Sequence, residues 1–131
     1  LGAVVASLLA YAIMGQTFAP SPSPTASPVA ALLVETLYTF ALVLVVLNSA
    51  CSDKTKGNSF YGLAIGFTIV VAAFAGGGVS GGAFNPAVGV GPTLVHGLMG
   101  GGSFASLWLY LVGPFLGGAL AAAVFKVQEQ G

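Results

Sequence analysis

A polar, glycine-rich segment separates two long apolar stretches and carries the residues best suited to bind a solute. It runs from Gly76 to Pro92 and contains the triplet Asn85-Pro86-Ala87. Proline has a fixed φ and no N–H, so Pro86 predicts the first residue of a short helix with Asn85 as its N-cap. At membrane depth such a helix start points backbone N–H groups into a cavity, and the Asn85 amide adds a donor. The segment is therefore predicted to hydrogen-bond a polar solute in transit.

The composition predicts an integral, multi-pass membrane protein. Hydrophobic residues make up 56% of the 131 residues and charged residues 5%, whereas about a quarter of a soluble domain is charged. A net charge of zero argues against nucleic acid as a partner and leaves the lipid bilayer as the expected environment. Neither enzyme activity nor a metal or cofactor is expected, because the sequence shows no carboxylate pair, metal-ligand spacing or phosphate-binding loop.

Four apolar segments are predicted to span the membrane or to end a span, since about 20 apolar residues cross the hydrocarbon. A proline-rich segment, residues 19–28, is predicted as an exposed, extended loop because alternating prolines remove donors and disfavour helix. A polar turn is predicted over residues 52–59. The four apolar segments are Leu1–Phe18, Val29–Cys51, Phe60–Ala75 and Phe104–Val127.

Small residues recur at helical spacing in two of the apolar segments. Gly62 and Gly66 share one helix face, and Gly113, Gly117 and Ala121 share another. Such faces let a second backbone approach closely in a membrane. The pattern predicts a tightly packed bundle.

The segment Val79–Met99 is predicted to re-enter the membrane without crossing it. All three basic residues are lysines, namely Lys54, Lys56 and Lys126. If the segment turns back, the three lysines fall on one side of the membrane, as the positive-inside rule prefers. A half helix over Ala87–His96 would be roughly 15 Å long, about half the hydrocarbon thickness.

A half helix that begins Asn-Pro-Ala, follows Ser80-Gly81 and continues into Gly91-Pro92 resembles the second signature loop of the aquaporin, or major intrinsic protein, family. Within that family it is similar to the plant tonoplast-type branch. The resemblance implies an all-α, aquaporin-like bundle as one domain over residues 1–131. It implies about four transmembrane helices and one re-entrant half helix over residues 79–99, without the N-terminal part of the family's inverted repeat. Further matches to the family's spans are Leu1-Gly2-Ala3, Leu33–Phe40, Ala64–Phe67 and Trp108–Pro114.

The resemblance also implies roles for residues that support the loop. Asn85, Pro86 and Ala87 would form the pore motif. An ionisable residue inside a span is a functional candidate, and the resemblance gives that residue a supporting role, in which its carboxylate accepts hydrogen bonds from backbone N–H groups of the loop. The supporting residues are Glu35, Ser80 and Gly81.

By the same resemblance, the pore filter falls on Ala73, Gly82 and Val88. Val88 stands where most members of the family have an arginine. Three small or apolar groups imply a constriction wider and less polar than a strict water filter. Such a filter would admit urea, ammonia or glycerol, or it is a filter no longer used.

Two functions from different classes remain open, because the family's pore is made of two inverted halves and this chain contains one Asn-Pro-Ala triplet. The first is a passive channel for water and small neutral solutes, expected as a homotetramer in a vacuolar-type or other internal membrane. The second is a non-conducting structural subunit that associates with other membrane subunits. The chain begins at Leu1 and not at a methionine, so the missing half is expected upstream if the protein is a channel.

Overall fold

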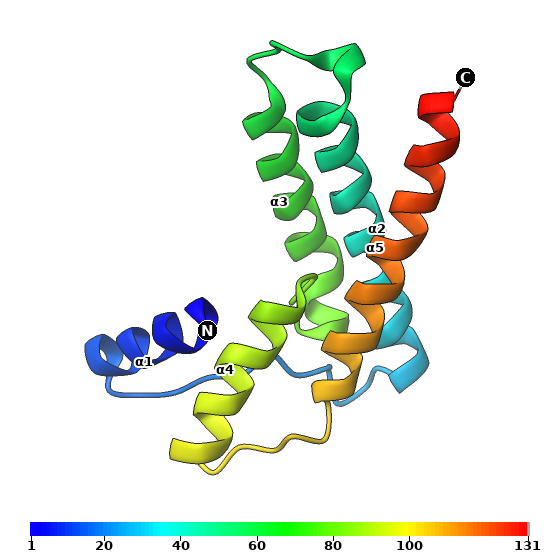
Figure 1. Cartoon of the computed structure of the whole chain (residues 1–131). Coiled ribbons are helices and arrows are strands. Elements are labelled where there is room, and N and C mark those ends of the chain that lie inside the picture. The colour runs from blue at the N-terminus through cyan, green and yellow to red at the C-terminus, as the bar shows by residue number, and fades with distance from the viewer. Residues whose placement is uncertain (131) are drawn as a thin grey trace.

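The computed structural model describes residues 1–130, and every regular element in that range is a helix (Figure 1). The predicted all-α membrane bundle is confirmed. The elements in chain order are α1 (Gly2–Met14), α2 (Pro28–Val46), η1 (Leu47–Cys51), η2 (Asp53–Thr55), α3 (Tyr61–Ser80), α4 (Pro86–Met99) and α5 (Leu107–Gln130).

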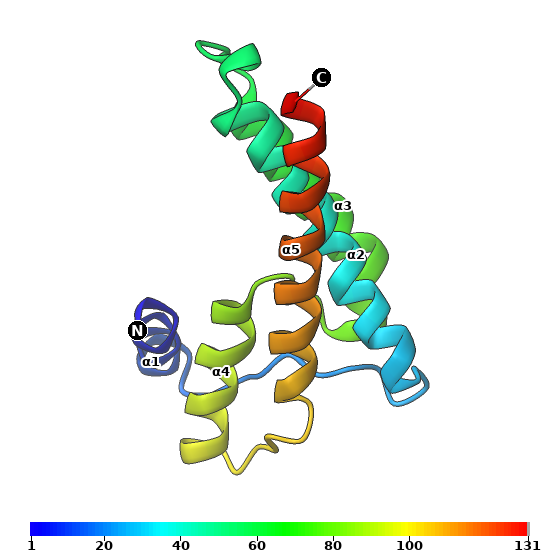
Figure 2. The same cartoon turned by 45° about the vertical axis from the view of Figure 1, so that its right-hand side comes forward.

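Three helices are long and apolar enough to cross a membrane: α2 with its π-helical extension η1, α3 and α5. The helix α2 packs against both α3 and α5, and the two views show these three rods side by side (Figures 1 and 2). The remaining predicted segment, Leu1–Phe18, contains α1. This helix has 13 residues and is therefore about 20 Å long, short of the roughly 30 Å of hydrocarbon. It lies crosswise to the three long helices (Figure 1), and its predicted place at the end of a span stays a prediction.

The predicted small-residue face of α5 packs on α2. A Cβ placed at Gly113 would lie 2.7 Å from Glu35 Cβ, and one placed at Gly117 would lie 2.8 Å from the backbone nitrogen of Phe40. Ala121 is fully buried. No larger side chain fits at the two glycines, so the backbones of α2 and α5 are held in close approach.

The helix α3 departs from the sequence prediction in two ways. It runs to Ser80, beyond its predicted end, because Gly76 fits against Val34 at a place where a Cβ would lie 2.7 Å from Val34 Cγ1. Packing there outweighs the low helix propensity of the glycine run. A Cβ placed at Gly62 or Gly66 would meet nothing within 4 Å among the described residues, so the close approach predicted for this face is not made to another described helix.

The proline-rich segment ends one residue earlier than predicted. Pro28 is the first residue of α2, and the Ser27 hydroxyl caps the helix by accepting a hydrogen bond from the Ala30 N–H at 3.1 Å. Proline suits this position because its fixed φ is helical and its missing N–H would be unpaired there. Residues 15–27 contain no helix and connect α1 to α2.

The helix α4 begins partway along the three long helices and descends to the end of the molecule opposite the C-terminus (Figure 1). With 14 residues it is about 21 Å long, longer at both ends than the predicted helix over residues 87–96. It packs between α5 and α1. Ala3 of α1 lies so close to Gly91 that a Cβ there would be 2.6 Å from the Ala3 carbonyl carbon.

The turn between α2 and α3 lies beside the C-terminal end of α5. The Lys54 ammonium donates to the Gln128 carbonyl oxygen at 3.1 Å, and the Ser52 hydroxyl donates to Glu129 Oε1 at 2.8 Å. Lys54, Lys56 and Lys126 therefore share one end of the bundle, at the top of Figure 1.

We predict that residues 56 and 103 face opposite sides of the membrane. The test places a cysteine at one of the two exposed positions, Lys56→Cys or Ser103→Cys, in a Cys51→Ser background and labels sealed vesicles with a membrane-impermeant maleimide. Only one of the two variants should react without permeabilisation, because the re-entrant arrangement returns the chain to the side it entered from. Labelling of both from the same side would show that α4 crosses the membrane.

Candidate functional site

The triplet Asn85-Pro86-Ala87 opens α4 as predicted. Asn85 is the N-cap, with extended backbone angles (φ −157°, ψ 125°), and its Oδ1 accepts a hydrogen bond from the Ala87 N–H at 2.9 Å. Pro86 occupies the first helical position, where its fixed φ is favourable. The Asn85 side chain is exposed, and its amide nitrogen donates to no described residue. The cap thus occupies the acceptor of Asn85 and leaves its amide donor without a partner among the described residues.

The loop before the triplet, residues 81–84, is held in an unusual backbone shape. Gly81 and Gly82 have positive φ angles of 91° and 68°, and Phe84 has φ 49°. For a residue with a side chain this left-handed conformation costs about 1–3 kcal/mol and persists where surrounding contacts determine it. The Phe84 ring packs edge-on against Tyr38, with centroids 5.5 Å apart.

The carboxylate of Glu35 supplies the other contacts that fix this loop. Its Oε1 accepts hydrogen bonds from the Ser80 hydroxyl at 2.7 Å and from the Ala83 N–H at 3.0 Å, and its Oε2 accepts one from the Phe84 N–H at 2.7 Å. Glu35 and Ser80 are both fully buried. Three donors converge on one carboxylate, which is the arrangement that a buried acidic group requires.

Tyr110 of α5 completes this network, and sequence reasoning missed it. Its hydroxyl donates to the Ser80 carbonyl oxygen at 2.5 Å, and its side chain is fully buried. Gly89 of α4 lies against the same tyrosine, because a Cβ at Gly89 would overlap Tyr110 Cβ. Tyr110 therefore fastens α4 and the end of α3 to α5. A tyrosine inside an apolar helix was the available signal, since a buried phenol needs a hydrogen-bond partner.

The structure brings together two of the three predicted filter positions. Gly82 and Val88 line one hollow of about 440 Å³, whereas Ala73 is exposed on α3 and does not line it. Val88 is 45% exposed. The hollow has a wall that sequence reasoning did not predict, formed by residues 18–21 of the connector between α1 and α2.

A second hollow, of about 530 Å³, lies between α2 and α5 beside the motif. Asn85 and Pro86 line it together with apolar side chains such as Val43 and Phe115. Thr39 also lines it, and its hydroxyl is buried without a hydrogen-bond partner among the described residues. This apolar face next to the motif is not covered by any other part of the described chain.

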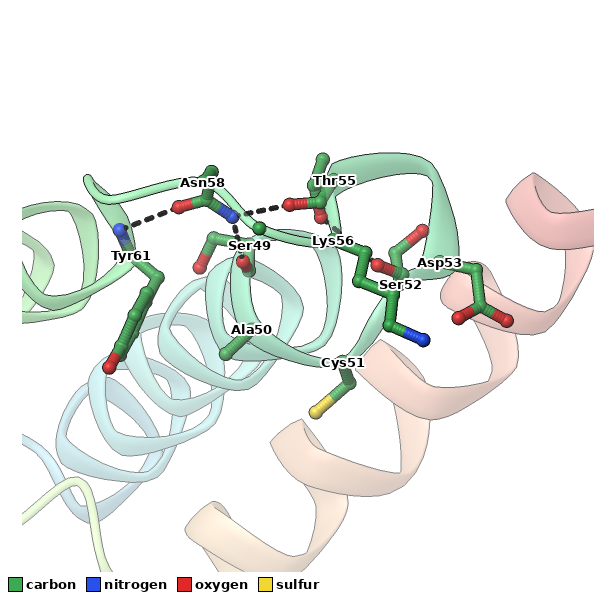
Figure 3. Close-up of a pocket in the computed structure, with 10 residues that line it drawn as sticks. Ser49, Ala50, Cys51, Ser52, Asp53, Thr55, Lys56, Asn58 and Tyr61 are labelled. Carbon is green, nitrogen blue, oxygen red and sulfur yellow. Dashed lines mark hydrogen bonds between the residues drawn. The ribbon is translucent and has the colours of Figure 1, made fainter.

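A third hollow, of about 550 Å³, lies at the turn between α2 and α3, away from the motif. Figure 3 shows that its polar groups bind one another: the Asn58 amide nitrogen donates to the carbonyl oxygens of Ser49 and Thr55 at 2.7 Å each, and Asn58 Oδ1 accepts from the Tyr61 N–H at 3.0 Å. These bonds close the turn and cap α3. The hollow is therefore a structural feature of the turn.

Comparison with known proteins gives one family and several relatives. The profile of the Major intrinsic protein family matches residues 1–125. Aquaporin NIP1-4 of Oryza sativa subsp. japonica is 34% identical over 95% of this chain and 44% of its own length. Probable aquaporin TIP2-2 of Arabidopsis thaliana is 36% identical and aquaporin TIP2-3 of Zea mays 38%, each over 95% of this chain and 49% of its own length. The chain thus spans less than half the length of these relatives.

We predict that Glu35→Gln destabilises the fold by about 1–3 kcal/mol. Glutamine replaces one carboxylate oxygen with an NH₂ group, which cannot accept a hydrogen bond, so at least one buried donor of the loop is left without an acceptor. Thermal unfolding in detergent measures the loss. Glu129→Gln is the matched control, since Glu129 is exposed and the glutamine oxygen can still accept the hydrogen bond from the Ser52 hydroxyl; it should change stability by no more than about 0.5 kcal/mol. A Glu35→Gln protein of unchanged stability would contradict the role given to the carboxylate.

Proposed function

The chain belongs to the major intrinsic protein family, a family of membrane channels and not of enzymes, and from this premise we propose that it forms half of a pore that passively conducts water and small neutral solutes. The observation that carries the proposal is the free amide donor of Asn85 at the start of α4. A helix start inside a bundle presents partly positive N–H groups, and such donors favour neutral hydrogen-bonding solutes and oppose cations.

The fixed position of this donor supports conduction over a purely structural use of the motif. Asn85 follows directly on Phe84, whose N–H is held by Glu35 at 2.7 Å. The backbone on the other side of Asn85 is held by α4, which packs on α5. A donor held on both sides stays at one depth in the pore. A passing solute can therefore exchange a hydrogen bond to water for one to Asn85, and the protein does not have to rearrange to form it.

The filter positions support solutes larger than water. Val88 offers an apolar wall where an arginine would offer a fixed charge and five donors, and Gly82 beside it adds no side chain. Ala73, the third filter position implied by the family resemblance, carries only a methyl group and does not line the hollow of Gly82 and Val88. We therefore propose that the pore admits urea, ammonia or glycerol as well as water.

The apolar hollow beside Asn85 and Pro86 supports the placement of a second half there. A surface with an unpartnered Thr39 hydroxyl and about 530 Å³ of open apolar space is suited to cover by another membrane segment. We propose that this segment is the inverted half of the pore. Residues 79–99 would then form the re-entrant part of a single domain. Complete pores would assemble as tetramers in a vacuolar-type or other internal membrane.

The same hollow favours one alternative function. If the segment that covers it belongs to a different membrane protein with no half helix of its own, the assembly contains one set of donors and no continuous pore. The chain is then a non-conducting structural subunit of a larger complex. The two functions differ in a measurable quantity, the water permeability of the purified assembly.

We predict that Asn85→Ser lowers water flux several-fold while α4 stays folded. Serine is as good an N-cap as asparagine, so the substitution removes the amide donor and leaves the cap. The assay is stopped-flow swelling of vesicles that carry the native protein with any segment or subunit that purifies with it, and circular dichroism checks the helix content. A native assembly that conducts no water would favour the structural subunit, and full flux through Asn85→Ser would remove Asn85 from the pore.

A further inference from the structure

The proline-rich connector between α1 and α2, residues 15–27, lies against the end of α3 and the loop of residues 81–84. The Ser23 N–H donates to the carbonyl oxygen of Val79, in the last turn of α3, at 3.0 Å. At Gly81, a Cβ would lie 2.7 Å from the backbone nitrogen and oxygen of Ser21. The connector and the loop therefore touch backbone to backbone, and the sequence-based view of the connector as a plain exposed loop is incomplete.

A third attachment joins the start of the connector to the far end of α4. The Thr17 hydroxyl and His96 Nδ1 are hydrogen-bonded at 2.8 Å, and both residues are half-buried. The His96 carbonyl oxygen accepts bonds from the Gly100 N–H at 2.8 Å and the Gly102 N–H at 3.2 Å. His96 is thereby fixed by the loop after α4, and Thr17 is fixed by His96.

Phe18 lies between these attachments and lines the hollow that Gly82 and Val88 also line. Its side chain is 56% exposed, although it is one of the largest apolar groups of the chain. Prolines restrict the backbone that follows, since each fixes its own φ and disfavours helix in the residue before it. Phe18 is therefore presented to the hollow by a stiff segment that is anchored on both sides.

We propose that the connector forms a wall of the solute entrance, that Phe18 is a specificity-determining residue there, and that the Thr17–His96 hydrogen bond is the contact that positions it. The inference rests on the proposed channel function. Solutes with a larger cross-section than water pass between Phe18 and the side formed by Gly82 and Val88. The aromatic ring limits the size of these solutes at an entrance that has no charged residue among its lining groups.

The first test compares urea flux with water flux in Phe18→Ala, using the native protein with any segment that purifies with it. The ratio of urea to water flux should rise roughly threefold, which corresponds to about 0.65 kcal/mol of barrier at 1.36 kcal/mol per tenfold. Phe60→Ala is the matched control, because Phe60 is 54% exposed and lies at the start of α3, at the opposite end of the bundle. Its ratio should equal that of the parent protein.

The second test does not depend on flux. In a Cys51→Ser background, Val88→Cys is labelled with a bulky, membrane-impermeant maleimide, alone and together with a change at Thr17. Thr17→Val removes the hydroxyl at nearly the same shape and should speed the labelling several-fold. Thr17→Ser keeps the hydroxyl and should label at the original rate.

The outcomes separate the entrance from the channel itself. An unchanged urea-to-water ratio in a conducting Phe18→Ala protein would overturn the entrance role, and equal labelling with Thr17→Val and Thr17→Ser would overturn the positioning role of the hydrogen bond. A parent protein without water flux would overturn the proposed function and the entrance role with it. The labelling rates would then still decide whether Thr17 holds the connector in place.

Discussion

A carboxylate buried in an apolar bundle must receive hydrogen bonds, and this requirement shapes the site around Glu35. The chain meets it with one hydroxyl and two consecutive backbone N–H groups, from Ser80, Ala83 and Phe84. To bring both N–H groups onto the carboxylate, the loop after α3 turns back on itself through positive φ angles, including that of Phe84. Asn85 follows immediately, so its position is a consequence of these bonds.

The close approach of helices then makes this arrangement rigid. Gly113 leaves room for Glu35 against α5, and Gly89 leaves room for Tyr110 against α4. Tyr110 in turn holds the Ser80 carbonyl oxygen. A larger residue at either glycine would separate the helices that carry the donors and the acceptor, so residues without side chains are as important to the site as Glu35.

Much of the fold could be predicted because apolar length and proline position are local properties. The long helices and the Pro86 start followed from them, as did the packing face at Gly113. The end of α3 and the position of the connector could not be predicted, because both depend on contacts between segments far apart in the chain. Examples are Gly76 with Val34 and Ser23 with Val79. The roles given to the filter residues and to the motif remain predictions.

The most direct test of this account is the hydrogen exchange of the Ala83 and Phe84 amides, measured residue by residue in the native protein and in Glu35→Gln. Both amides lie in a loop, where exchange is ordinarily fast. If the carboxylate holds them, they should exchange about as slowly as the amide of Ala121, which is fully buried in the middle of α5, and speed up selectively in Glu35→Gln. Fast exchange in the native protein, or equal protection in both proteins, would contradict the account.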